Sequence, residues 1–137
     1  MNESDIHRAI QLAATHEGWR LFRQNVGMAW AGNVVEQTPS RVVIVNPRPL
    51  RAGLCTGSGD LIGWVPMDIG GVTVGVFASV EAKTKRGRVT DAQANFLTQV
   101  NDFGGIAVIA RSDSEAVEKI NEAVARKIRD LRHALTQ

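Results

Sequence analysis

The chain has one cysteine, no tyrosine and no long hydrophobic run. With Cys55 alone, neither an intrachain disulfide nor a cysteine-based zinc site can form, and we expect a buried, inert thiol. No apolar segment approaches the roughly 20 residues that cross a bilayer, and the N-terminus lacks the apolar region of a signal peptide. These absences predict a soluble, cytoplasmic protein without a membrane partner.

An excess of charge of one sign is also missing. Lysine and arginine number 16 against 14 aspartates and glutamates, for a net charge of +2. This balance permits a polyanionic partner but does not by itself indicate one. The phosphate-cradling G-x-x-x-x-G-K-[ST] loop is absent, so no nucleotide cofactor is expected. A length of 137 residues with 44% apolar content predicts one domain over residues 1–137.

The hydrophobic periodicity predicts a mixed chain of helices and strands. Helices are expected over 4–17, from Thr90 to Gly104, and from Ser112 to the C-terminus. Strands are expected over 19–25, 41–45, 60–65, 72–83 and 106–110. Residues 26–40 and 46–59 are expected to form loops, and Pro66, Gly70 and Gly71 a turn. The predicted fold class is α/β, with a central mixed β-sheet flanked by helices in the order αβββαβ plus a C-terminal helix.

The most informative pattern is Asp60 followed by Glu81-Ala82-Lys83. Strand side chains alternate between faces, so Glu81 and Lys83 share one face. If the strand at 60–65 pairs antiparallel with the strand at 72–83, the carboxylates of Asp60 and Glu81 meet at neighbouring strand ends. Two carboxylates about 4 Å apart repel by roughly 4 kcal/mol at an effective dielectric near 20. The pair therefore favours a shared proton or a bound metal.

Oxygen ligands of this kind suggest Mg²⁺ or Mn²⁺. Lys83, two positions after Glu81, would lie beside the attacking water, where an ammonium orients the nucleophile and offsets charge on a phosphate. Metal-dependent phosphodiester hydrolysis is the chemistry that this set of residues predicts.

The sequence resembles the virus-type replication-repair nuclease (VRR-NUC) family of the PD-(D/E)XK nuclease superfamily. The shared segments are 3–6 (ESDI), 23–27 (RQNVG), 59–62 (GDLI), 81–84 (EAKT), 87–93 (GRVTDAQ) and 104–108 (GGIAV). An acidic residue followed by E-x-K is weak alone, but this order of segments is fairly specific. The resemblance implies a restriction-endonuclease-like fold.

The resemblance also implies roles for single residues. Asp60 and Glu81 would hold the metal, the Ala82 carbonyl could add a ligand, and Lys83 would be catalytic. Gln93 would support the site, and Glu3 matches an assisting acidic residue of the first helix. Two departures are visible: His7 stands where the family commonly has Gln, and the connection from 27 to 59 is longer than in compact members.

Basic residues near these motifs are the expected DNA contacts. They are Lys85, Arg86, Arg88, Arg51 and Arg23, with Arg41 and Arg48 in the same segment as Arg51. Nothing in the sequence encodes base readout. Small members of the resembled family act on branched DNA and resemble dimeric Holliday-junction resolvases, which implies a homodimeric endonuclease of phage or prophage type.

Simpler explanations exist for each residue. Asp60 could cap a turn, Glu81 and Lys83 could form an exposed ion pair, and Gln93 has capping-box spacing to Thr90. Glu3 could favour a helix N-terminus, and the three histidines most often occupy solvated helix faces. Trp30 could stack on bases, although tryptophan more often fills a core. The competing functions are a non-cleaving or partner-dependent subunit that binds structured DNA, and a restriction-type nuclease for linear duplex.

Overall fold

Three helices with defined caps begin where the sequence supplies capping side chains. The computed structural model describes residues 2–137. Helix α1 (Glu3–His16) is capped by Asn2 in a capping box with Asp5, and α2 (Asp91–Asp102) by Thr90 in a capping box with Gln93. The long α3 (Asp113–Leu135) starts at Ser112, whose side chain accepts from the Glu115 amide. None of the helices of residues 2–137 is both long and apolar enough to cross a membrane.

The main sheet has four strands in the order β1-β4-β5-β6. Its strands are β1 (Arg20–Arg23), β4 (Leu61–Ile69), β5 (Val72–Ala82) and β6 (Ile106–Ala110). β4 pairs antiparallel with β1 and β5, whereas β5 pairs parallel with β6. The predicted α/β class with a central mixed sheet flanked by helices is therefore confirmed. Pro66, expected in a turn, lies inside β4, and Gly70 and Gly71 alone make the turn, each with positive φ.

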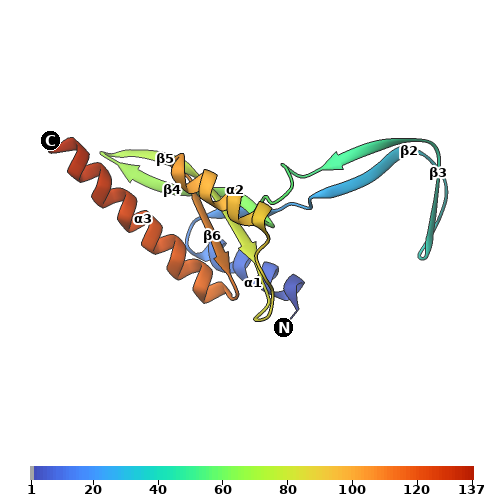
Figure 1. The fold of residues 1–137 in the computed structure, drawn as a ribbon, viewed down its shortest axis with the longest axis horizontal. Coiled ribbons are helices and arrows are strands. Elements are labelled where there is room, and N and C mark those ends of the chain that lie inside the picture. The colour runs from blue at the N-terminus through green and yellow to red at the C-terminus, as the bar shows by residue number, and fades with distance from the viewer. Residues whose placement is uncertain (1) are drawn as a thin grey trace.

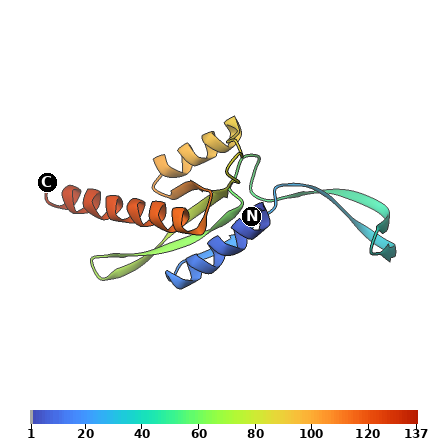
Figure 2. The same cartoon turned by 90° about the horizontal axis from the view of Figure 1, so that it is seen from below.

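The hydrophobic core lies between one face of this sheet and helices α1 and α3. Ile10 of α1 and Ile120 of α3 are almost fully buried, and so are Leu61 and Val80 of the central strands. Helix α2 lies on the opposite face, beside β6 (Figure 2). Burying a leucine or isoleucine contributes about 1.5 to 3 kcal/mol, so this layer holds the strand ends in place.

A separate hairpin arm, β2 and β3 with their connecting turn, projects from the body. β2 (Gly27–Thr38) pairs antiparallel with β3 (Arg41–Ala52), and Figure 1 shows the pair extending away from the sheet. The loop predicted at 26–40 is therefore wrong over most of its length, and the loop predicted at 46–59 is wrong over 46–52 and right over 53–59. The ribbon tolerates Pro47 and Pro49 because neither strand has a further neighbour that needs their missing N–H groups.

Three single-residue expectations can be compared with the structure. Cys55, expected to be buried, is exposed in the loop after β3. Trp19 is buried, as is usual for tryptophan, whereas Trp30 on the arm and Trp64 on β4 are about half exposed. His7, expected on a solvated face, is only 4% exposed. Its surroundings belong to the site described next.

Candidate active site

Asp60 is placed by the close approach of its loop to β5. A side chain at Gly59 would collide with the Ser79 hydroxyl and the Val80 carbonyl, so only glycine lets the loop pass this near the strand. At the next residue, Oδ2 of Asp60 accepts a hydrogen bond from the Ala82 amide of β5 over 3.0 Å. The carboxylate therefore lies at the start of β4, against the end of β5.

Gln24 holds the same loop from the other side. Its side-chain amide donates to Ser58 Oγ (2.8 Å) and to the Gly59 carbonyl (2.7 Å), and its Oε1 accepts from the Leu54 amide (3.0 Å). Its backbone amide donates to the Asp60 carbonyl over 2.9 Å. One side chain thus fixes both the approach to Asp60 and the point where the arm rejoins the body.

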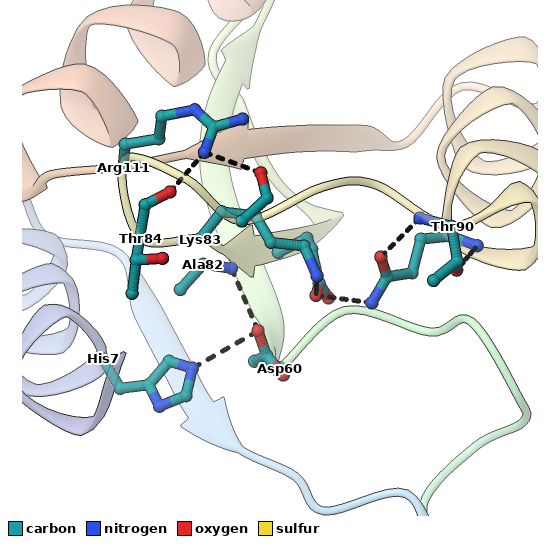
Figure 3. A network of polar contacts seen from close by, with 10 residues as sticks. His7, Asp60, Ala82, Lys83, Thr84, Thr90 and Arg111 are labelled. Atoms are coloured by element: carbon teal, nitrogen blue, oxygen red, sulfur yellow. Dashed lines mark hydrogen bonds and ion pairs between the residues drawn. The ribbon is translucent and has the colours of Figure 1, made fainter. Parts of the chain in front are cut away.

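Glu81 sits at the end of β5 between two partners. Its Oε1 lies 3.0 Å from Nζ of Lys83 and accepts from Nε2 of Gln93 over 2.7 Å (Figure 3). The Glu81 and Lys83 side chains are 8% and 13% exposed, so this is not an exposed surface ion pair. Gln93 makes this contact while also completing the capping box with Thr90, so its two predicted interactions coexist.

The electrostatics of Glu81 favour a bound cation. Burial raises the pKa of its carboxyl above the ordinary 4.5, the Lys83 hydrogen bond opposes the rise, and the charge of Asp60 adds to it. Its second oxygen, Oε2, is buried and has no hydrogen-bond partner in the described part of the chain. A divalent ion would give that oxygen a partner and would stabilise the ionised form.

His7 and Glu3 approach Asp60 from α1. Nε2 of His7 lies 3.3 Å from Oδ2 of Asp60, without hydrogen-bond geometry, and one ligand atom from each of the three residues lies within 4.8 Å of the others. The expectation that the histidines occupy solvated faces is wrong for His7. Residues three or four apart share a helix face, which is how Glu3 and His7 reach one site.

The segment after Lys83 is held by β6. The Lys83 amide donates to the Ala110 carbonyl over 3.0 Å, continuing the strand pairing by one residue. Arg111 donates to the carbonyls of Thr84 and Gly87, the latter over 3.0 Å (Figure 3). Arg111 therefore fixes the turn that leads from Lys83 toward α2.

The residues predicted for the site fall into two groups. Asp60, Glu81, Ala82, Lys83, Gln93 and Glu3 gather at the meeting point of α1, α2 and the ends of β4 and β5. The predicted DNA contacts are dispersed: Lys85, Arg86 and Arg88 are exposed in the turn before α2, Arg23 is exposed at the end of β1, and Arg51 is exposed on the arm.

Four residues near the site were not predicted: His7, Gln24, Ser58 and Arg111. Gln24 belongs to the RQNVG segment, and that membership was the only sequence signal for it. The spacing of Glu3 and His7 was a second usable signal. Arg111 donates to backbone carbonyls, and Ser58 accepts from the Gln24 side chain and donates to the Cys55 carbonyl. Such contacts leave no pattern in a sequence.

A mixed sheet with helices on both faces, and an E-x-K strand end facing a second carboxylate, define a PD-(D/E)XK-type nuclease fold. The family model of the VRR-NUC domain matches residues 3–114 of the chain. The protein therefore belongs to the VRR-NUC family, as the resemblance predicted, and its function is of the nuclease type and concerns DNA. No curated protein matches the chain.

Proposed function

We propose that the protein is a divalent-metal-dependent endonuclease that hydrolyses phosphodiester bonds in branched DNA, with the four-way Holliday junction as its substrate. The observation that carries this proposal is the buried Glu81 carboxylate, shared between Lys83 and Gln93 beside the Asp60 strand end. A structural ion pair does not need a carboxylate oxygen that is buried without a partner.

Mg²⁺ or Mn²⁺ is the cofactor that the donor atoms fit. Asp60 and Glu81 would hold it, with the Ala82 carbonyl and Glu3 as further oxygen donors. When bound, a divalent ion supplies Lewis-acid stabilisation of the charge that develops on the phosphate. The raised pKa of Glu81 agrees with this arrangement, because Lys83 alone does not offset the effects of burial and of the Asp60 charge, and a divalent ion would add a second cation.

Lys83 orients the attacking water and offsets negative charge on the scissile phosphate. Its side chain is 13% exposed and its ammonium lies 3.0 Å from Glu81, so its position is fixed before substrate binds. Gln93 keeps the Glu81 carboxylate in one orientation from the opposite side. The loss of either residue should therefore affect the reaction more than the binding of DNA.

The DNA backbone would contact the basic turn of Lys85, Arg86 and Arg88, which directly follows Lys83. Arg23 and Arg51 lie exposed on β1 and the arm and would extend these contacts. On duplex DNA each neutralised phosphate changes the logarithmic salt slope of affinity by roughly −0.9. Arg86→Ala should lower that slope by about one without changing the rate of the chemical step.

A homodimer would bring two active centres to the two strands that a junction resolvase must cut. The arm supports it, because no residue of β2 or β3 is buried and a lone two-stranded hairpin is at best marginally stable in water. Trp30 and Pro47 share one hollow apolar surface with Val42 and Ile44.

The nuclease proposal is tested with a labelled four-way junction and a matched linear duplex. Each is incubated with Mg²⁺, Mn²⁺ or chelator, beside Lys83→Ala and a control, Lys127→Ala, on α3. We expect metal-dependent cutting of the junction by the native protein and the control, and loss of cutting by about a hundredfold or more in Lys83→Ala.

Two results of this experiment would contradict the proposal of a junction-cutting nuclease. Tight junction binding without product would make the protein a binding subunit with a nuclease fold. Equal cutting of junction and linear duplex would make it a duplex nuclease. Folding of each variant is checked by circular dichroism, so that a loss of activity can be distinguished from unfolding of the variant.

The homodimer is tested separately, without DNA, by light scattering. We expect a mass of two chains for the native protein and of one chain for Trp30→Glu, since a carboxylate cannot be buried in an apolar interface without a partner. Gln37→Glu, exposed near the arm tip, is the control that should remain dimeric. A native mass of one chain over the working concentrations would refute the dimer.

A further inference from the structure

His7 is a buried side chain whose polar atoms lack hydrogen bonds. The residue is 4% exposed, and neither Nδ1 nor Nε2 has a hydrogen-bond partner in the part of the chain that the structure describes. Buried polar atoms in proteins nearly always have hydrogen-bond partners, so an imidazole whose Nε2 makes only an ion-pair contact with Asp60 among the described residues needs an explanation. Figure 3 shows the ring edge turned toward Asp60.

The position of Nε2 suits a ligand of an ion that Asp60 also binds. Two donor atoms at about 2.1 Å from one octahedral ion lie about 3.0 Å apart when they are adjacent. Nε2 of His7 is 3.3 Å from Oδ2 of Asp60, and the Glu3 carboxylate joins them within 4.8 Å. Glu3 is exposed in the first turn of α1, so a small rotation of its side chain can close the remaining gap.

We propose that His7 is a nitrogen ligand of the divalent ion held by Asp60, and that it makes this centre select Mn²⁺ over Mg²⁺. The inference rests on the proposed metal-dependent function and adds a donor that the all-oxygen set lacks. Mg²⁺ favours oxygen ligands and octahedral water, whereas imidazole binds first-row transition ions well. A glutamine side chain at this position would offer the ion only its amide oxygen.

A simpler role for His7 would be to hold Asp60 in place. A positioning contact would affect Mg²⁺ and Mn²⁺ equally, because it would act through the carboxylate that binds both. A direct ligand would affect Mn²⁺ more. The ratio of the two affinities therefore separates the two roles, and it can be measured without DNA or turnover.

The experiment is calorimetric titration of the full chain with MnCl₂ and MgCl₂, using the native protein, His7→Gln and His16→Gln. His16, exposed in the last turn of α1, is the matched control. We expect His7→Gln to weaken Mn²⁺ binding about tenfold or more and Mg²⁺ binding less than about threefold. His16→Gln should match the native protein. Thermal unfolding without metal checks that His7→Gln is folded.

Pulsed electron paramagnetic resonance of bound Mn²⁺ gives a direct second readout. An imidazole ligand adds ¹⁴N modulation, which should be present in the native protein and His16→Gln and absent from His7→Gln. Equal weakening of both metals, or a native spectrum without ¹⁴N modulation, would overturn the proposal.

The experiments can refute the nuclease proposal and the proposal that His7 is a metal ligand independently of each other. Cutting of the junction by a protein without ¹⁴N coupling would remove only His7 as a ligand. Nitrogen-coupled Mn²⁺ in a protein that cuts no DNA would support the ligand and refute the nuclease.

Discussion

The body and the arm both contain strands with apolar side chains, but these side chains are buried in the body and exposed in the arm. In the body, Leu61 and Val80 are fully buried beneath α1 and α3. In the arm, Val35 and Leu50 are more than half exposed, because none of the helices within residues 2–137 lies along β2 and β3. The difference lies in the layer that covers a strand, so burial cannot be inferred from strand composition alone.

The body and the arm also differ in the candidate functional residues that they carry. The body brings together the carboxylates, Lys83 and His7, and the proposed metal chemistry requires these groups to be held within about 0.5 Å of their productive positions. The arm joins the body at the loop that Gln24 holds, next to Asp60. A contact made far out on the arm can therefore reach the centre through this loop or through residues 24–26, which connect β1 to β2.

The largest expected difference between the two regions is in packing. Leu61→Ala should lower the free energy of unfolding by about 2 to 5 kcal/mol, because it leaves a cavity in a closed core. Leu50→Ala should cost less than about 0.5 kcal/mol, because Leu50 is half exposed and pairs with Ala29, on the ribbon face opposite Trp30. Urea denaturation measures both. A loss above 2 kcal/mol in Leu50→Ala would mean that this face is covered too.

A smaller difference in stability is expected from adding a methyl group where two backbone segments lie close together. Gly59→Ala should destabilise the protein by about 1 to 3 kcal/mol and slow cleavage, because the new methyl group would push the Asp60 loop away from Ser79 and Val80. Gly27→Ala, at the base of the arm, meets no atom within 4 Å and should have almost no effect. Equal unfolding midpoints for the two variants would show that the loop moves freely against β5.

The body could be predicted from sequence because each of its elements has a local signal. The three helices have apolar stripes and capping side chains, and β5 and β6 are β-branched runs ended by clear breaks. The E-x-K segment and strand alternation together placed Glu81 and Lys83 on one face. The antiparallel pairing of β4 with β5 then set Asp60 beside them.

Residues 41–45 were correctly predicted as a strand and lie in β3, but the rest of the arm could not be predicted, for physical reasons. Pro47, Pro49 and Gly32 normally exclude a strand, but a ribbon with free edges and register shifts tolerates them. Asn46 even takes a positive φ of 54°, at the irregularity opposite Gly32. His7 was missed because its burial comes from the way α1 packs, and a single sequence does not reveal that packing.

The smallest expected difference between body and arm is in the stability that one ion pair in each region contributes. Glu115 lies 2.8 Å from Lys119 and also accepts from the Arg111 amide, and these hydrogen bonds lower the pKa of its carboxyl below 4.5. Its stabilising contribution is therefore present above about pH 4.5 and is lost as the pH falls through the lowered value. Glu115→Gln should cost about 0.5 to 1 kcal/mol at pH 7, and the difference from the native protein should vanish in acid.

The matching pair on the arm is Glu36 with Arg41, 3.8 Å apart and largely exposed. Glu36→Gln should change the unfolding free energy by less than about 0.5 kcal/mol, because water screens the pair. Thermal melts of both variants between pH 3 and pH 7 measure the contrast. A larger effect at Glu36 than at Glu115 would show that the arm tip is desolvated, which requires a covering surface such as a second copy of the chain. Repeating the melts at two protein concentrations shows whether the covering surface is a second chain. Only burial between two chains makes the melting temperature depend on protein concentration.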